Sequence, residues 1–170
     1  MTPDTDPART GIRDAVPDDA AAIHAIYAPI VRDTHISFEI EPPSEDEVRR
    51  RLEAAPVAWL VYEHQGKVAA FASAGRFRER DAYHRTAEAS IYVAPAARRK
   101  GVGRGLCETI LARLRDAGYH SVVGVVALPN PASERMLETL GFRRVGVLRE
   151  AGFKLGRWWD VALWQRDLGI

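Results

Sequence analysis

Apolar residues recur along the chain at two spacings, and the spacing separates predicted helices from predicted strands. The clearest helical pattern is Val102, Leu106, Ile110 and Leu114, which follow one another at i+4 positions and so share one face. Apolar faces at helical spacing recur in two other segments, and Asn130, Pro131 and Gly141 indicate the start and the end of a fourth helix. We therefore predict helices within residues 12–34, 41–55, 97–114 and 129–142.

Residues that cap helix ends stand where three of these helices should begin. Asp18 precedes the first apolar face, and Ser44 with Glu47 forms a capping-box pattern before the second. Asn130 is placed to cap the fourth helix, and Pro131 suits its first turn. These residues fix the expected helix starts.

Strands are predicted where apolar residues alternate or form short runs between turn signals. Residues 57–77 indicate two strands joined at Gln65–Gly66, and residues 86–94 indicate another. Residues 121–128 form an apolar run typical of a buried strand, and residues 143–168 predict two final strands. Strands interleaved with helices after an antiparallel start indicate the α/β class, with a mixed central β-sheet flanked by helices.

Composition indicates that these elements form one domain. The chain has 170 residues, of which 46% are hydrophobic, and it shows neither an internal repeat nor a low-complexity linker. Its first residues are polar and interrupted by Pro3 and Pro7. We expect a flexible tail at residues 1–10 and a single domain at residues 11–170.

Charge and cysteine content narrow the expected partners and compartment. Lys and Arg number 24 against 23 Asp and Glu, so bulk charge does not indicate a nucleic-acid partner. No apolar run approaches the roughly 20 residues that span a bilayer, and the N-terminus lacks an apolar signal core. Cys107 stands alone, is expected in the core, and belongs to no metal-ligand spacing. We expect a cytoplasmic protein without a metal, a membrane partner or a nucleic-acid partner.

A basic, glycine-rich stretch, ARRKGVGRG, stands immediately before the third predicted helix. A Walker loop would continue after Gly103 with Lys and Ser or Thr, and it does not. A dinucleotide fingerprint would place its third glycine where Leu106 stands. A pyrophosphate cradle at a helix N-terminus fits better, because glycines let backbone N–H groups approach phosphates. A basic turn before a solvated helix start is the alternative that the loop alone leaves open.

The stretch Arg98–Gly103 also matches the R/Q-x-x-G-x-G/A motif of the GNAT superfamily of acyl-CoA N-acyltransferases. It lies between a predicted strand, SIYV, and a predicted helix, as in that family. From about Ile12 to Leu168 the chain resembles phosphinothricin N-acetyltransferases and the related enzymes that act on methionine sulfoximine or sulfone. The segments that carry the resemblance are ISFE, RERDAYHRTAEASIYV, LPN, ERMLETLGF, REAGFKLGRWWDV and WQRDL.

The resemblance implies a GNAT fold that binds acetyl-CoA where two strands splay apart. It implies direct acetyl transfer, in a ternary complex, to the α-amine of a small amino acid or analogue. The backbone N–H of Val93 would stabilise the oxyanion, while Asn130 and Ser133 would contact the pantetheine arm. A helix N-cap alone is the other interpretation of Asn130. The CoA pyrophosphate would be bound by the backbone of Arg98, Arg99, Lys100, Gly101, Val102, Gly103 and Arg104.

The resemblance also assigns the proton acceptor. Glu88, in TAEAS, matches the family's acidic residue on that strand and would act as the general base, directly or through a water. Burial in an apolar-leaning strand would hold its pKa in a useful range. By its spacing alone, Glu88 reads more simply as a solvated glutamate that faces outward.

Five further residues match the substrate site of the phosphinothricin enzymes. Arg78 and Arg80 would hold the carboxylate or phosphinate of the substrate, since arginine forks suit such groups. Tyr83 and Tyr92 match tyrosines that contact the substrate, and Phe38 matches an aromatic residue at the mouth of the site. The alternatives are a charged, solvated loop for the arginines and packing roles for the tyrosines.

One position departs from the family. Leu137 stands where the phosphinothricin enzymes carry histidine and many GNAT members carry tyrosine as the acid for the thiolate. Leucine donates no proton, so another group or water must serve, or CoA must leave as a thiolate. The departure also supports a rival hypothesis, a non-catalytic acyl-CoA-binding or regulatory protein. Acetylation of a peptide or another amine is a further alternative.

The C-terminal strands predict an oligomer. In GRWWDVALW, strand alternation would place Trp158 and Trp159 on opposite faces. A chain of this size has little interior for its four tryptophans, so a second copy is expected to cover part of that surface. We therefore expect a homodimer that uses the C-terminal strands.

Overall fold

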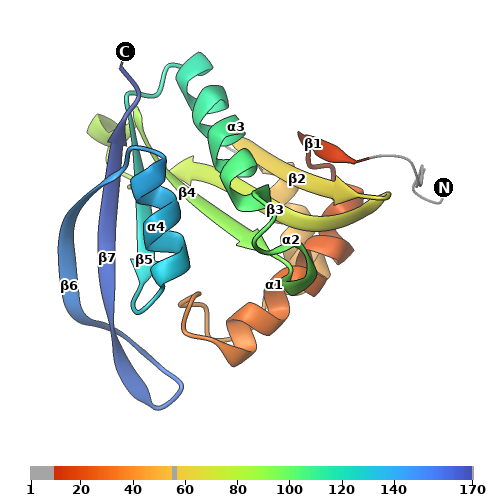
Figure 1. Ribbon diagram of the computed structural model, residues 1–170, viewed down its shortest axis with the longest axis horizontal. Coiled ribbons are helices and arrows are strands. Elements are labelled where there is room, and N and C mark those ends of the chain that lie inside the picture. The colour runs from red at the N-terminus through yellow and green to blue at the C-terminus, as the bar shows by residue number, and fades with distance from the viewer. Residues whose placement is uncertain (1–9, 55–56, 170) are drawn as a thin grey trace.

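The computed structural model describes residues 10–54 and 57–169, so the tail predicted at residues 1–10 lies almost wholly outside the described part. Within that part, the strands form a seven-stranded sheet in the order β1-β2-β3-β4-β5-β7-β6 (Figure 1). Strands β4 and β5 run parallel, and the other neighbours run antiparallel. The strands are β1 (Gly11–Asp14), β2 (Ala58–His64), β3 (Lys67–Arg76), β4 (Thr86–Val93), β5 (Ser121–Ala127), β6 (Arg143–Lys154) and β7 (Arg157–Asp167).

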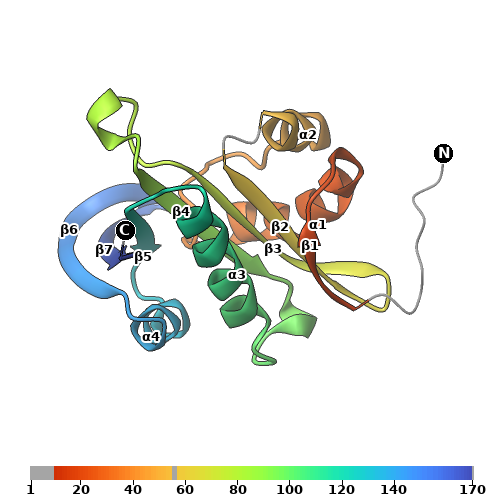
Figure 2. The same cartoon turned by 90° about the horizontal axis from the view of Figure 1, so that it is seen from above.

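Four helices cover the two faces of the sheet in the described residues (Figure 2). Helices α1 (Ala20–Asp33) and α2 (Glu45–Glu53) lie on one face, and α3 (Val102–Asp116) and α4 (Pro131–Thr139) lie on the other. The predicted apolar face of α3 is confirmed, because its four residues are at most 8% exposed. The predicted mixed α/β sheet with flanking helices is therefore confirmed.

The capping predictions were right for two helices and wrong for one. The Ser44 hydroxyl accepts a hydrogen bond from the Glu47 N–H (3.1 Å), and the Asn130 side chain accepts one from the Ser133 N–H (3.2 Å). Asp18 does not cap α1: a 3-10 turn precedes the helix and Asp19 occupies the N-cap position. Asp19 instead forms an ion pair with Arg13 at 2.7 Å.

The parallel strands β4 and β5 separate beyond their first residues. Their pairing runs from Thr86↔Ser121 to Glu88↔Val123 and then stops, although both strands continue. The remaining five residues of β4 keep only β3 as a hydrogen-bonded neighbour. This divergence is the splay that the GNAT resemblance implied.

The β6–β7 hairpin extends beyond the rest of the sheet (Figure 1). Strand β7 pairs with β5 only from Val161 to Asp167, while β6 follows β7 back to the pair Lys154↔Arg157. The predicted opposite orientation of two tryptophans agrees with their contacts: Trp158 packs against Phe153, and Trp159 stacks on His35. Large apolar side chains that are at least half exposed along this hairpin are Val145, Leu148, Phe153, Leu155 and Trp158.

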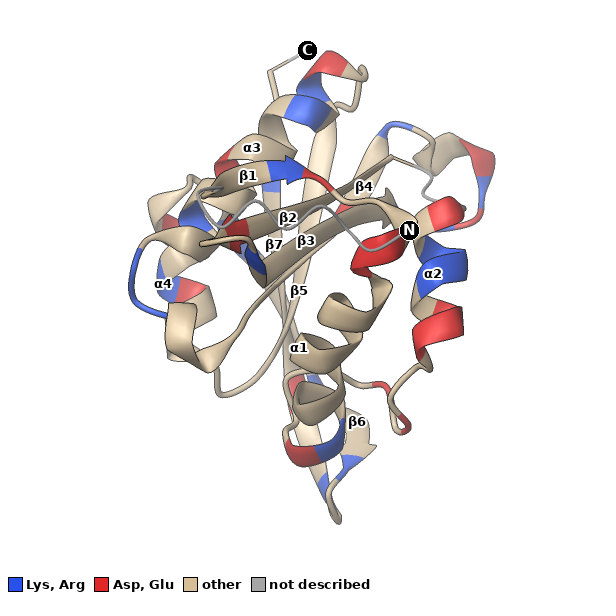
Figure 3. Cartoon of the chain, turned by 90° about the vertical axis from the view of Figure 1, so that its right-hand side faces the viewer, with Lys and Arg blue, Asp and Glu red and all other residues tan. Residues whose placement is uncertain are grey.

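Charged residues of both signs are interspersed over α2 and the neighbouring surface (Figure 3). The network on α2 includes Glu47, which pairs with Arg50 at 2.6 Å and Arg51 at 3.1 Å. Within residues 10–54 and 57–169, no helix is both long and apolar enough to cross a bilayer.

Candidate active site

Strand β4 presents a polar row to one face of the sheet. Alternation along the strand places Glu88, Ser90 and Tyr92 on the side of α1 and α2. The intervening residues Ile91 and Val93 pack against the core on the side of α3. The strand therefore carries its candidate proton acceptor and its apolar support on opposite faces.

Glu88 occupies the last position at which β4 pairs with β5, so it lies at the start of the splay. Its side chain is half-buried, and this burial raises the pKa of the carboxyl, while the nearby Arg78 lowers it. An outward-facing, fully solvated glutamate would not experience that burial. A carboxylate whose pKa is raised by burial is a stronger base than a solvated one, so the position suits a proton acceptor.

The backbone of Val93 is turned towards the splay. The Ala94 N–H donates to the Ala69 carbonyl at 2.9 Å, and successive antiparallel pairs alternate between bonded and non-bonded. Val93 pairs with Ala70 in the next, non-bonded position, so its N–H points away from β3. Because β5 no longer pairs there, this N–H is placed to reach a group in the opening between β4 and β5.

The glycine-rich stretch wraps around the N-terminus of α3. Arg99 and Gly101 have positive φ angles of 63° and 77°, and α3 begins at Val102. The first N–H groups of a helix have no partner within the helix, so this turn presents several donors together. A Cβ on Gly103 would lie 3.4 Å from both the Val93 side chain and the Met136 sulfur. The cradle therefore meets the end of β4 and helix α4.

The start of α4 brings two predicted cofactor contacts to the same region. Asn130 caps α4 through Ser133, as the simpler interpretation held, and its side-chain NH₂ is not used by that bond. Ser133 is partly buried. The preceding Pro129 carbonyl lies 3.0 Å from the His35 Nε2, which joins this turn to the loop after α1.

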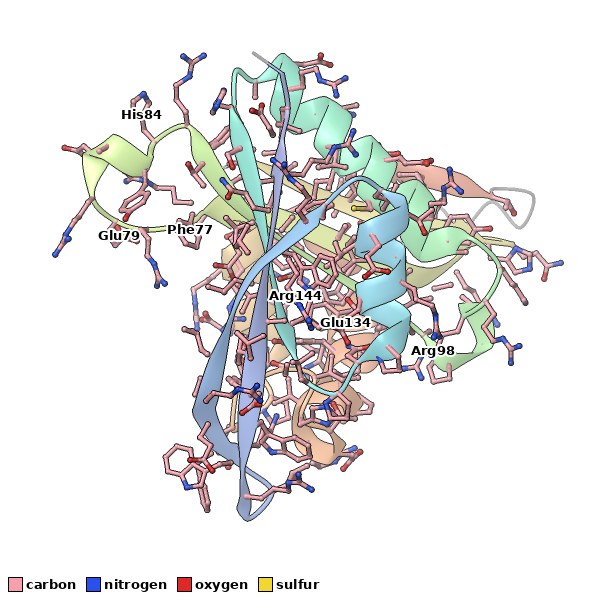
Figure 4. All side chains as sticks on the ribbon, turned by 60° about the vertical axis from the view of Figure 1, so that its left-hand side comes forward. Phe77, Glu79, His84, Arg98, Glu134 and Arg144 are labelled. Atoms are coloured by element: carbon pink, nitrogen blue, oxygen red, sulfur yellow. The ribbon has the colours of Figure 1, made fainter. Side chains whose placement is uncertain are left out.

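The basic segment between β3 and β4 lies at the opposite end of β4 from Arg98. Figure 4 shows Phe77, Glu79 and His84 on this projecting loop, far from Arg98. The guanidinium of Arg78 lies over the Phe77 ring, 4.8 Å from its centre. Its charge lowers the pKa of Glu88, so the loop places Arg78, a predicted substrate residue, near the predicted base. Two further predicted residues, Arg80 and Tyr83, are exposed on the loop.

Tyr92, on the same face of β4 as Glu88, lies in an aromatic cluster. Its ring is 4.8 Å from that of Tyr27 and 5.2 Å from that of Phe71. Burial raises the pKa of both tyrosines. This cluster borders a pocket of about 160 Å³ on the face that carries Glu88, lined by Ile23, Tyr27, Glu39, Pro43, Val48, Arg51, Trp59, Phe71, Ser73, Ser90 and Tyr92.

A hydrogen-bond network joins this pocket to the α1–α2 loop (residues 34–44). The Tyr27 hydroxyl lies 2.7 Å from the Ser37 hydroxyl and donates to Glu39 at 2.9 Å. The Arg51 guanidinium forms a bidentate ion pair with Glu39, with N–O distances of 2.9 and 3.2 Å. Of the residues in this loop, only Phe38 could be predicted from the sequence as a site residue, because the partners in the network are far apart in the chain and share no motif.

Leu137 and Cys107 both belong to the core. Leu137 is 6% exposed, and its side chain would lie 3.4 Å from a Cβ on Gly124, the first residue of β5 beyond the pairing with β4. Residue 137 therefore supplies an apolar wall at the splay. Cys107 is 2% exposed, and burial raises the pKa of its thiol to about 12, so it is a core residue as predicted.

A larger groove, of about 1100 Å³, runs along the outer side of α1. Arg98 lines one end of it, but neither Glu88 nor Val93 does. In the described part of the chain, no three His, Cys, Asp or Glu side chains gather to hold a metal ion.

The sequence of the chain matches a known protein family. Residues 21–142 match the family described as "Acetyltransferase (GNAT) family". The chain belongs to this family of acetyltransferases.

Similar proteins, including one with a solved structure, are also named as acetyltransferases. The chain is 39% identical to a phosphinothricin N-acetyltransferase from Streptomyces viridochromogenes, over all of this chain and 93% of that protein. It is 35% identical to an L-methionine sulfoximine/L-methionine sulfone acetyltransferase from Salmonella typhimurium, over 92% and 94% of the two chains. A phosphinothricin acetyltransferase from Sinorhizobium meliloti, solved in complex with acetyl-CoA, superposes with a TM-score of 0.90 at 35% identity, covering 94% and 89% of the chains.

Proposed function

We propose that this protein transfers the acetyl group of acetyl-CoA directly to the α-amine of a small amino acid or analogue, of the phosphinothricin or methionine sulfoximine type. The observation that carries this function is the half-buried Glu88 at the start of the splay. The names of the relatives support the substrate class. The single, reduced cysteine supports a cytoplasmic location.

The residues at the splay fit acetyl-CoA. Its pyrophosphate would accept hydrogen bonds from the backbone between Arg98 and Arg104, and Asn130 and Ser133 would contact the pantetheine arm. The positive φ of Gly101 and the close approach of Gly103 to β4 support a backbone cradle rather than a side-chain clamp. The acetyl-CoA of the Sinorhizobium meliloti structure supports the same ligand here.

In the proposed mechanism, Glu88 removes a proton from the bound ammonium. The free amine then attacks the thioester carbonyl within the ternary complex, and the Val93 N–H stabilises the oxyanion that develops. The attacking nitrogen then loses its second proton to water or to the departing sulfur, the C–S bond breaks, and CoA leaves. The side chain of Leu137 has no ionisable proton to donate. The thiolate therefore leaves as such or is protonated by another group.

The amino-acid substrate would lie along the polar row of β4. Arg78 and Arg80, with Tyr83, would hold its anionic groups, as guanidinium forks bind carboxylates and phosphinates well. Phe38 and Tyr92 would close the other side. The charge of Arg78 is near enough to lower the pKa of Glu88, which supports an acceptor that places its amine and its anionic group close together.

The function is tested by the release of free thiol from acetyl-CoA across a panel of amines. The panel contains phosphinothricin, methionine sulfoximine, methionine sulfone, ordinary amino acids, spermidine and a short peptide. Release is expected with at least one amino-acid analogue. Release with the peptide or spermidine alone would contradict the substrate class. Binding of acetyl-CoA without release across the panel would instead favour the non-catalytic acyl-CoA-binding protein, the second candidate, which Leu137 favours.

We also propose a homodimer that uses the C-terminal strands. The exposed apolar residues along the β6–β7 hairpin support it, because apolar patches of this kind commonly mark association surfaces. Sedimentation velocity at micromolar concentration is expected to give the mass of two chains. Trp158→Glu, on the exposed face of the hairpin, is expected to shift the protein to a monomer. Sedimentation of the parent protein as a monomer would contradict the dimer.

A further inference from the structure

The tip of the β6–β7 hairpin carries a lysine whose charge is buried. Lys154, the last residue of β6, is 5% exposed. In the described residues, no carboxylate lies within ion-pair distance of its Nζ. The Nζ donates instead to the Ser37 backbone carbonyl at 2.5 Å. Burial of an ammonium is costly unless its hydrogen bonds are made, so this contact constrains both partners strongly.

Gly152, also on β6, packs closely against the α1–α2 loop. A Cβ at Gly152 would overlap the Phe38 ring, far inside van der Waals contact. The ring therefore lies directly on the β6 backbone, in space that only glycine leaves open. Phe38 and the hairpin fit together at this one residue.

Trp159 adds a third contact between the hairpin and the loop. Its ring stacks on His35 at 4.1 Å with 9° between the planes, and its Nε1 donates to the Lys154 carbonyl at 2.8 Å. Arg157 lies 4.2 Å from the centre of the same ring. The hairpin thus contacts the α1–α2 loop at His35, Ser37 and Phe38.

The held loop leads to the polar row of β4. Ser37 and Glu39 both contact the Tyr27 hydroxyl, and Tyr27 packs on Tyr92. A continuous series of contacts therefore runs from Lys154 to the strand that carries Glu88. None of the residues in this series belongs to the cradle at the N-terminus of α3.

We propose that Lys154 and Gly152 are positioning residues for the amine acceptor: together they hold the α1–α2 loop, with Phe38, over the acceptor side of the site. This inference rests on the proposed function, in which Phe38 contacts the acceptor. The tip of the hairpin then affects affinity for the amine much more than affinity for acetyl-CoA, because the series of contacts from Lys154 ends at β4 and does not include the cradle.

Lys154→Met tests the buried contact, because methionine keeps an unbranched chain and removes the ammonium. We expect the KM of the best amine to rise about ten-fold, the usual scale for a lost hydrogen bond to a charged group. The KM of acetyl-CoA is expected to change much less than that of the amine, and the kcat is expected to stay unchanged. An unchanged amine KM, or an equal rise for both substrates, would overturn the proposal.

Gly152→Ala tests the same inference through a different contact, and Gly146→Ala is its matched control. Both glycines lie on β6, but nothing lies within 4 Å of a Cβ at Gly146. Alanine at position 152 must displace Phe38, so the amine KM should rise there and not at position 146. Equal behaviour of the two variants would contradict a role for the Phe38 contact.

Chemical rescue separates positioning from general damage. In a Cys107→Ala background, Lys154→Cys is treated with 2-bromoethylamine, whereby the thiolate displaces bromide and an ammonium is restored at the end of the side chain. The amine KM should return towards that of the background protein. Modification at position 154 without recovery would contradict a requirement for the charge.

Amide hydrogen exchange tests the loop independently of catalysis. A peptide that covers residues 34–41 should exchange faster in Lys154→Met than in the parent, while a peptide from α3 should not change. If no amine is acetylated, the proposed function fails, but exchange still decides whether Lys154 holds the loop. Unchanged exchange in residues 34–41 would overturn the inference even in an active enzyme.

Discussion

Glu88→Gln is expected to lower kcat by roughly 10²- to 10⁴-fold, the scale on which general acid–base catalysis contributes. Glutamine keeps the shape of the side chain but accepts no proton at neutral pH. Acetyl-CoA binding should be unchanged, since the cradle lies at the other end of β4. Single-turnover kinetics with a saturating amine, together with calorimetric titration of acetyl-CoA, measure both quantities.

The matched control is Glu79→Gln, in the exposed loop between β3 and β4 (Figure 4). It removes the same charge without touching the proposed base, so kcat should remain that of the parent. The thermal stability of Glu88→Gln should not fall, because burial raises the pKa of Glu88 and so disfavours its ionised form in the folded protein. Equal kcat in Glu88→Gln and the parent would remove Glu88 from the mechanism.

The pH profile provides a second test of the same assignment. The active form of Glu88 is the carboxylate, so activity should fall as the pH drops through its pKa, which burial raises above the ordinary value. Arg78 lowers that pKa, and Arg78→Ala should therefore move the acidic limb of kcat to higher pH. An acidic limb that persists in Glu88→Gln would belong to another group.

Gly101→Ala should weaken acetyl-CoA binding by roughly 5- to 30-fold. Gly101 has a φ of 77°, and a residue with a Cβ loses about 1–2 kcal/mol in that conformation. Without ligand, the loop of the variant relaxes to another conformation. It must return to the cradle conformation to bind acetyl-CoA, so this conformational free energy is subtracted from the free energy of binding. Calorimetric titration with acetyl-CoA and with CoA measures the loss directly.

Gly156→Ala is the control for backbone strain alone. Gly156 has a φ of 74° in the β6–β7 turn and, like Gly101, has nothing within 4 Å of the position that a Cβ would take. Its substitution should leave acetyl-CoA affinity unchanged. Arg99→Ala should cost less affinity than Gly101→Ala, because it removes charge but keeps the backbone donors. A larger loss at Arg99 would show that the side chains bind the pyrophosphate.

The elements of the fold could be predicted wherever the signal was local. The i+4 face of α3, the turn at Gln65–Gly66 and the cap at Asn130 each depend on residues close together in the chain. Asp18 was the wrong choice of cap. Its neighbour Asp19 occupies the N-cap position and forms an ion pair with Arg13, which lies on β1. A cap is a local feature, but the choice between two adjacent aspartates was made by a tertiary ion pair.

The candidate site divides in the same way. The motif at Arg98–Gly103 lies within one short segment and could be read from the sequence, whereas Glu88 was selected through the family resemblance, because its spacing alone indicated a solvated glutamate. The splay was implied by the resemblance alone, since it depends on where β4 stops pairing with a strand more than 30 residues away. The aromatic cluster that receives Tyr92 was not predicted, because Tyr27 and Phe71 reach it from α1 and β3.

The sequence by itself determined the class of sheet, because the spacing of apolar residues is local; the cradle before α3 and the candidate base were predicted through a motif and a family resemblance that the sequence also carries. Only the tertiary structure decided which residues contact the α1–α2 loop. Lys154 and Ser37 are separated by 117 positions, and neither has a pattern that points to the other. Their contact exists because the hairpin extends past the sheet and the α1–α2 loop packs against it, and packing of that kind depends on the whole chain.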